Sequence, residues 1–312
     1  MLAPVTSNLA GEGAGQESLF TAEEDASYDR GATTFGQICS VCHAPDGKGT
    51  PILDDPEDRK MAPPVSGSKR VLGRPEYIMT VLLAGITGPV DEMNYEGIMI
   101  SMASFDDGWI ADVASYVRNS FNNSASMITS NQVARLRKQL GEVGNSFTIP
   151  EVLSMLPVAL TNQANWKVTA SHNSEKAADA VNGVSAGKSW SSETKQAEAM
   201  WFQVELPEPI TFWELSLNAP APAAGTPASS PQAYKVQTSM NGSDWSKSLA
   251  DGNGRNPTTV IGVDPTQAKF VRVTLTSPAT NSAPWAINRV QIFPSSGAVP
   301  VASSAPRVNR FD

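Results

Sequence analysis

Two cysteines and a histidine within five positions are the side chains of this sequence best suited to chemistry. Cys39, Cys42 and His43 are arranged as C-x-x-C-H, and the 312-residue chain has no other cysteine. Two thiols three residues apart on one helical turn can both add to the vinyl groups of one porphyrin edge, and the following imidazole then binds the iron. The spacing therefore predicts one covalently attached haem c, with His43 as its proximal ligand.

Other functions of these side chains fit the sequence less well. A thioredoxin-like thiol pair requires a strand–helix–strand setting, which the residues around Cys39 do not provide. A structural zinc ion requires four ligands, and the only other histidine, His172, is remote in the sequence. The same remoteness argues against coordination of the iron by two histidines.

The length and composition indicate a soluble, acidic protein of two ordinary domains or one large one. A chain of 312 residues is long enough for two cores, and its 23 prolines and 23 glycines indicate many turns and a β-rich part. A formal charge of −8 argues against nucleic acids and anionic membrane surfaces as partners. No stretch approaches ~18 uninterrupted apolar residues, so no membrane span is predicted.

The expected location of the protein contrasts with the start of its chain. Haem is attached covalently outside the cytoplasm, so we expect an extracytoplasmic protein, in the periplasm, at the cell surface or secreted. Residues 1–30 are acidic and carry neither the basic start nor the apolar core of an export signal. We therefore expect the chain to be a piece of a longer exported polypeptide or to begin at a processed end.

Hydrophobic periodicity divides the chain into a helical first half and a strand-rich second half. Within the first half, helices are expected at 28–43, 76–84 and 107–119, with a polar connecting helix at 130–140. The expected organisation is a flexible acidic tail at 1–26, a haem domain at 27–121, a helical linker at 122–157, a β-sandwich at 158–294 and an extended tail at 295–312.

Alternating apolar residues in the second half predict strands. Trp201–Leu206 and Phe270–Leu275 have the period of two, and Asn-Gly and Asp-Gly pairs elsewhere in this half signal turns. Several short strands at such spacing predict a sandwich or barrel. Residues 219–230, rich in alanine and proline, are expected to form a mobile surface loop.

Residues 27–121 resemble a class I cytochrome c domain, of the kind found in large exported bacterial dehydrogenase-like proteins. The motifs that carry the resemblance are Gly31-x-x-x-Phe35-x-x-x-Cys39, Asp46-Gly47-Lys48-Gly49 and Pro63-Pro64-Val65-x-Gly67-Ser68. The resemblance implies an all-α domain in which the Pro63 carbonyl accepts the ring N–H of His43. Such a bond would fix the ring and raise its basicity.

The resemblance also implies a methionine as the sixth iron ligand. The family places it before a helix with a Tyr-Ile-Arg-like segment, which is Tyr116-Val117-Arg118 here. Counting back assigns the position to Met99, with Met102 as the alternative and Met93 as a more distant third, although the usual following proline is absent. His43 and Met99 are thus the expected metal ligands, and such ligation raises the reduction potential.

Residues 158–294 resemble the discoidin, or coagulation factor type C, family, which includes many bacterial carbohydrate-binding modules. The matching segments are Trp166–His172, Ala180–Gly183, Trp190, Trp201–Leu206, Tyr234–Trp245, Phe270–Val273 and Trp285–Ile287. The resemblance implies an all-β, eight-stranded, jelly-roll-like sandwich. Most of these tryptophans match core positions, and Trp213 has no clear assignment.

The calcium ion that members of this family often bind is not expected here. Asn182 lies at the turn of that site, and Lys188 and Arg289 occupy the positions of a threonine and a glutamate ligand. Two basic side chains would repel the ion. Sugar binding would require exposed aromatic residues on the loops at one end of the sandwich.

The sequence as a whole predicts an electron carrier without a catalytic site of its own. One-electron transfer through a single haem c would serve redox partner proteins, and the sandwich would dock the relay to a glycan, a cell surface or another protein. Two alternatives remain open. The chain could be an assembly subunit of a larger electron-transfer complex or filament, or the C-terminal electron-accepting part of a sugar or alcohol dehydrogenase.

Overall fold

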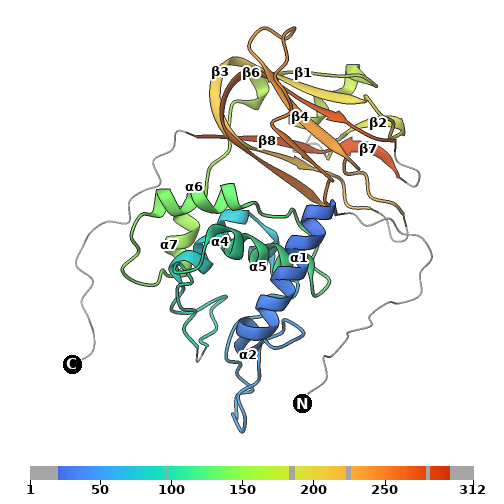
Figure 1. Ribbon diagram of the computed structural model, residues 1–312. Helices are drawn as coiled ribbons and strands as arrows, with labels where there is room; N and C mark the ends of the chain where they lie inside the picture. The colour runs from blue at the N-terminus through green and yellow to red at the C-terminus, as the bar shows by residue number, and fades with distance from the viewer. Residues whose placement is uncertain (1–19, 96, 183–186, 223–225, 279–281, 296–312) are drawn as a thin grey trace.

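The computed structural model describes residues 20–95, 97–182, 187–222, 226–278 and 282–295. Helices from the first half of the chain lie beneath a β-sandwich from the second half (Figure 1). The buried apolar side chains of the helices and those of the sandwich form separate clusters. Most of the two expected terminal tails, and part of the loop expected at 219–230, lie outside the described residues.

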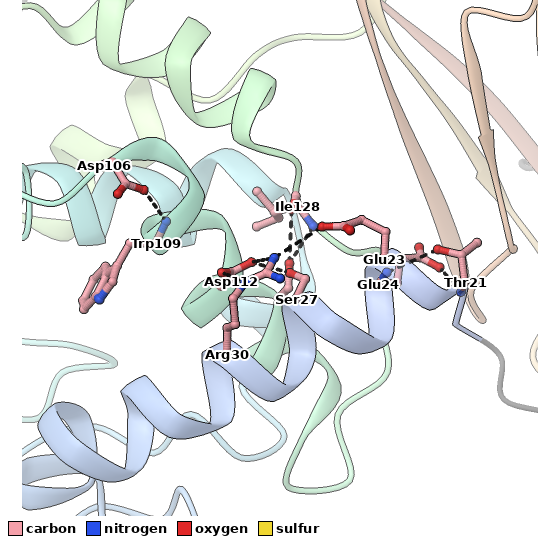
Figure 2. A network of polar contacts seen from close by, with 10 residues as sticks. Thr21, Glu23, Glu24, Ser27, Arg30, Asp106, Trp109, Asp112 and Ile128 are labelled. Carbon is pink, nitrogen blue, oxygen red and sulfur yellow. Dashed lines mark hydrogen bonds and ion pairs between the residues drawn. The ribbon is translucent and has the colours of Figure 1, made fainter.

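Seven α-helices precede the sandwich in the described residues. Their bounds are α1 Ala22–Thr34, α2 Ser40–His43, α3 Lys69–Leu72, α4 Pro75–Ala84, α5 Asp107–Asn119, α6 Ser130–Leu140 and α7 Ile149–Ser154. A π-helical turn, Phe35–Cys39, joins α1 to α2. The helices expected at 76–84 and 107–119 are confirmed as α4 and α5, the latter capped by Asp106, which accepts the Trp109 N–H at 2.8 Å (Figure 2).

The first helix begins earlier than the sequence pattern predicts. Thr21 Oγ1 accepts the Glu24 N–H at 3.3 Å, and the Glu24 carboxylate accepts the Thr21 N–H at 2.8 Å (Figure 2). This reciprocal capping box starts α1 at Ala22. The expected tail is therefore wrong for residues 22–26, because composition alone gives no weight to the Thr-x-x-Glu signature.

Residues 122–157 belong to the helical core and do not form a linker. Val133 and Leu136 of α6 pack with Ile128 in the main helical cluster, and Ile149 and Val152 of α7 lie in a second cluster. The physical reason is amphipathic spacing, because the buried apolar residues of α6 recur on one face of an otherwise polar helix.

One buried carboxylate fixes α1 against α5. Asp112 of α5 accepts hydrogen bonds from Ser27 Oγ at 2.7 Å and from Arg30 Nε at 2.6 Å (Figure 2). Gly31 permits this close crossing, because a Cβ there would lie 2.1 Å from the Asp112 carbonyl oxygen. Since the π-helical turn continues directly from α1, this crossing also sets the position of Cys39.

The expected β-sandwich is confirmed, with eight strands in the described residues. They are β1 Lys167–Ala170, β2 Trp190–Lys195, β3 Trp201–Asn218, β4 Tyr234–Ser239, β5 Ala250–Gly252, β6 Thr258–Leu275, β7 Pro284–Ile287 and β8 Arg289–Pro294. One sheet has the order β1-β3-β6-β4-β5, with β8 also paired to β3, and β2 pairs with β7 in a second sheet. The short helix α8, Asp179–Asn182, lies between β1 and β2 in the chain.

Aromatic side chains fill the space between the sheets. Trp190 and Trp285 are fully buried and meet edge to face, with ring centroids 5.3 Å apart, and Phe202 packs against both. Buried and partly exposed residues alternate along the first half of β3, whereas every residue from Phe212 to Leu217 is buried. This second half of the strand is buried on both faces because the helical part covers its outer face.

A buried ionic cluster joins the helical part to the sandwich. Arg74, just before α4, pairs with Glu214 of β3 and, at 2.8 Å, with Glu76 of α4. The two glutamates are only 3% and 4% exposed. The Arg74 guanidinium also lies 3.7 Å from the ring centroid of Phe293 in β8. Because separating such buried charges is costly, the cluster holds the two parts in one orientation.

Arg118 of α5 is 1% exposed and holds, within the helical part, the segment that contacts the sandwich through Ser126. Its Nε donates to the Ser126 carbonyl at 3.0 Å, and its Nη1 donates to the carbonyls of Val71 at 2.6 Å and Gly73 at 3.0 Å. Ser126 Oγ in turn accepts the N–H of Val260 in β6 at 2.6 Å. Burial lowers the pKa of Arg118 to about 10, so the guanidinium stays charged at neutral pH.

Replacement of Arg118 by methionine should destabilise the protein by about 3–5 kcal/mol, because it leaves buried carbonyl oxygens without a donor. Urea titration followed by tryptophan fluorescence measures this free energy of unfolding. Arg289→Met, at an exposed arginine of β8, is the matched control and should leave the midpoint unchanged. Equal midpoints for the two variants would contradict the role of Arg118.

The stability of the protein should fall as the pH rises above the usual carboxyl range. Burial first, and the nearby Glu76 second, raise the pKa of Glu214 well above its ordinary value of 4.5, although Arg74 opposes the shift. The folded protein therefore keeps a proton that the unfolded chain releases. The contribution of this proton to stability is complete below the ordinary pKa of a glutamate. It is lost as the pH rises towards the pKa of Glu214 in the folded protein.

Urea midpoints measured from about pH 4 to about pH 8 test this pH dependence. In Glu214→Gln the decline should be reduced, because the side chain no longer titrates. Glu208→Gln, at an exposed position of the same strand, should retain it. A Glu214→Gln profile parallel to that of the unsubstituted protein would show that this carboxyl group does not hold the proton.

Candidate functional site

A cavity of about 760 Å³ lies inside the helical part. Its mostly apolar walls come from the π-helical turn, the loop before α3, helices α4 and α5, and the segment 86–102. The walls include all of the residues assigned to the haem site from the sequence: Cys39, Cys42, His43, Pro63 and Met99. The structure thus brings these five residues together around one space.

The C-x-x-C-H segment reaches the cavity at the end of a locally widened helix. Phe35 begins the π-helical turn, is 2% exposed, and packs against the rings of Tyr116 and Phe121 with centroid distances of 5.4 and 5.1 Å. Cys39 and Cys42 follow this anchor, line the same cavity, and are both half-buried and free of disulfide bonds.

His43 is oriented by a backbone carbonyl. Its Nδ1 lies 3.2 Å from the Pro63 carbonyl oxygen, so the hydrogen bond requires the tautomer with the proton on Nδ1. Burial lowers the pKa of His43 and outweighs the opposing effect of the Pro63 bond, which keeps the ring neutral. A neutral ring protonated on Nδ1 has a free lone pair on Nε2, the form that binds a metal.

A tight turn after the motif holds Pro63 beside His43. Gly49 N–H donates to the His43 carbonyl at 2.8 Å, and Val65 N–H donates to the Gly47 carbonyl at 2.8 Å. Gly49 has φ of +85°, and a Cβ there would lie 2.4 Å from the Ala62 carbonyl oxygen. The turn therefore requires glycine both for its backbone conformation and for the close approach of the Pro63 segment.

The thiol environment argues against a dithiol redox pair. Burial, with a smaller contribution from Cys42, raises the pKa of Cys39 to about 11. Reactive cysteines of thiol–disulfide enzymes instead have lowered pKa values.

Two methionines face the cavity from the segment expected to supply a sixth ligand. Met99 is half-buried and exchanges backbone hydrogen bonds with Ile86, with its N–H donating at 3.2 Å and its carbonyl accepting at 2.8 Å. This pairing leaves the flanking Ile98 and Ile100 65% and 63% exposed. Met102 is 9% exposed and also lines the cavity, whereas Met93 is 54% exposed and lies outside its lining.

Sequence reasoning missed other polar or sulfur-bearing side chains of the cavity. Met61, from the segment just before Pro63, adds a third thioether to the lining, and Tyr77 and Tyr95 add two phenols. Burial raises the pKa of Tyr77 to about 12. The position of Tyr77 in the apolar stretch of α4 was a usable signal, whereas nothing in the local pattern marks Met61 or Tyr95.

The sandwich residues singled out from the sequence differ in their burial. Lys188 and Arg289 are both exposed, and the side chain of Asn182 lies outside what the structure describes. Trp213 is 8% exposed and faces the helical part, where the Arg135 guanidinium lies 5.6 Å from its ring centroid. It therefore packs at the interface between the two parts.

Part of the chain is similar to two cytochromes. Cytochrome c-552 from Thermus thermophilus is 29% identical over 118 residues, which cover 34% of this chain and 83% of that protein. A second cytochrome c-552, from another strain of the same organism, is also 29% identical, over 74% of its length. The similarity therefore concerns about a third of this chain.

The sandwich matches a family model and several solved structures. A CBM32 module from Clostridium perfringens, in complex with GalNAc-β-1,3-galactose, is 16% identical and covers 44% of this chain and 99% of its own, with a TM-score of 0.36. The C-terminal domain of a chitobiase from Bacteroides fragilis is 13% identical and covers 43% and 96%, also with a TM-score of 0.36. The F5/8 type C domain model matches residues 162–290. The F5/8 type C model thus spans most of the β-sandwich.

Proposed function

We propose that this protein transfers single electrons through one haem c held covalently in the cavity of its helical part. The observation that carries the proposal is the convergence of Cys39, Cys42, His43 and Met99 on one apolar space. The similarity of part of the chain to cytochrome c-552 supports it independently. Neither a dithiol redox pair nor a zinc site fits these side chains and this apolar cavity as well as haem does.

The proposal gives each residue a defined task. Cys39 and Cys42 form the covalent links, and His43 binds the iron through Nε2 while Pro63 holds its Nδ1 proton. Met99 would supply the sixth iron ligand, with Met102 as the alternative. Once bound, the haem supplies a one-electron redox centre whose potential is raised by methionine ligation. The buried apolar lining excludes water from this centre.

The sandwich, in this proposal, docks the electron carrier to a glycan or another surface outside the cytoplasm. Its F5/8 type C character supports a binding role, because the discoidin family includes many bacterial carbohydrate-binding modules. Covalent haem requires attachment outside the cytoplasm, which supports the same location. In the described part of the chain, no helix has the length and apolar character needed to cross a membrane.

Replacement of Met99 by alanine tests the proposed iron ligation. The protein is produced together with a haem-attachment apparatus, and its reduced-minus-oxidised spectrum is recorded with a redox titration. The unsubstituted protein should carry one covalent haem. Met99→Ala should retain that haem but lose the long-wavelength methionine–iron charge-transfer band, and its reduction potential should fall.

Met102→Ala is the matched control, because it removes a thioether from the same cavity. It should retain both the band and the potential. Retention of the band in Met99→Ala and its loss in Met102→Ala would contradict the assignment of Met99. Absence of covalent haem from the unsubstituted protein would refute the electron-transfer proposal itself.

The glycine turn after the motif provides a second test. Gly49→Ala should destabilise the protein by about 1–3 kcal/mol, because alanine is strained at positive φ and its Cβ would meet the Ala62 carbonyl. The displaced Pro63 segment should also reduce the fraction of chains that acquire haem. Thermal melting measures the loss of stability, and the haem-to-protein absorbance ratio measures the fraction of chains that carry haem.

Gly36→Ala serves as the control for this substitution. A Cβ at Gly36 would meet nothing within 4 Å, and this residue lies in the helical turn before the motif. The variant should therefore melt at or above the temperature of the unsubstituted protein. A larger loss for Gly36→Ala than for Gly49→Ala would show that the turn does not position the site.

A further inference from the structure

Two tryptophan side chains of the sandwich lie outside its hydrophobic core. Four of the six in this part are at most 8% exposed: Trp166, Trp190, Trp213 and Trp285. Trp201 and Trp245 are half-exposed. Trp201 begins β3, and Trp245 lies in the connection between β4 and β5, two strands of the same larger sheet.

The indole rings of Trp201 and Trp245 both contact the cationic side chain of Arg272. The Arg272 guanidinium of β6 lies 3.9 Å from the ring centroid of Trp245 and 4.6 Å from that of Trp201. Arg272 faces Gln203 of β3 on one side and Gln237 of β4 on the other in the strand register. Its Nε and Nη2 both donate to Gln203 Oε1, at 3.0 and 2.6 Å.

Arg272 has no carboxylate partner among the described residues, whereas Glu205 on the same sheet is close to two lysines. Glu205 lies within 3.8 Å of both Lys167 and Lys269. Asp251 of β5 lies opposite Lys235 of β4. Because a guanidinium has five N–H donors and the bonds to Gln203 use only Nε and Nη2, donors of Arg272 remain for a ligand.

This region of the sheet is also open. The second half of β3, from Phe212 to Leu217, is buried on both faces by the sandwich core and the helical part. In the first half, Trp201, Gln203 and Glu205 are only partly buried, and they alternate with buried core residues. The outer face of β3, β6 and β4 is thus available at the end away from the helices (Figure 1).

We propose that Trp201, Arg272 and Trp245 form a binding site for a uronic-acid-containing polysaccharide on this open face. The indole rings would contact the apolar face of sugar rings, and the free N–H groups of Arg272 would bind the sugar carboxylate in the planar geometry that suits a guanidinium. The site specifies where and what the sandwich binds, and it rests on the proposed glycan-docking function.

Isothermal titration of the full chain with oligogalacturonate tests this site, with a neutral galacto-oligosaccharide of equal length as comparison. Only oligogalacturonate should bind. Arg272→Gln should weaken binding at least tenfold, and Trp245→Ala should weaken it to a similar extent. Arg289→Gln removes the same charge from an exposed position of β8 and should change the affinity less than twofold.

Thermal melting of each variant separates lost binding from lost folding, and Arg272→Lys provides a variant that keeps the charge but loses the planar fork. Arg272→Lys should fold normally and bind more weakly than the unsubstituted protein. Binding equal to that of the unsubstituted protein in a folded Arg272→Gln variant overturns the site. Binding of dextran sulfate or of the neutral sugar without oligogalacturonate binding overturns the ligand class, while leaving the glycan-docking function intact.

Discussion

The hydrogen bonds of the buried Arg118 guanidinium are the interaction on which the rest of the structure depends. They hold the carbonyl of Val71 in α3, the carbonyl of Gly73 just after α3, and the carbonyl of Ser126, whose hydroxyl accepts the N–H of Val260 in β6. One charged group therefore ties the segment before α4 to the segment after α5 that contacts the sandwich. The nearby ion pairs of Arg74 with Glu76 and Glu214 extend this group of buried polar contacts to β3. Buried polar contacts of this kind favour one arrangement of the helical part and the sandwich, because any other arrangement would leave charges buried without partners.

The site itself depends on a different constraint, the close approach of two backbone segments around Gly49. The C-x-x-C-H segment places two thiols and an imidazole by local helical geometry, but it cannot supply the carbonyl that orients the imidazole. That carbonyl comes from Pro63, which is held by the turn between Gly47 and Gly49. The cavity is thus a product of a short helix and a loop that folds back on it, closed by α4 and α5.

Much of the fold could be predicted because its signals are local. The Asp106 cap and apolar face predict α5, and alternation predicts β3 and β6. The errors arose where a local signal was weak or ambiguous. A polar, basic helix such as α6 resembles a connector until its apolar face meets Ile128 and α5. Likewise, Met61 contributes to the cavity only because the loop before α3 turns inward, which no spacing in the sequence indicates.

The sequence by itself determined the chemistry that this protein can support. The spacing of Cys39, Cys42 and His43, and the alternation of the second half, follow from covalent geometry and backbone period, which act over a few residues. Tertiary structure alone decided which methionines share the cavity, which tryptophans stay outside the core, and how the two parts join. Glu214 and Arg74 are 140 positions apart, and Trp201 and Arg272 lie on different strands. Pairs so distant are brought together by burial and strand register, which only the folded chain specifies.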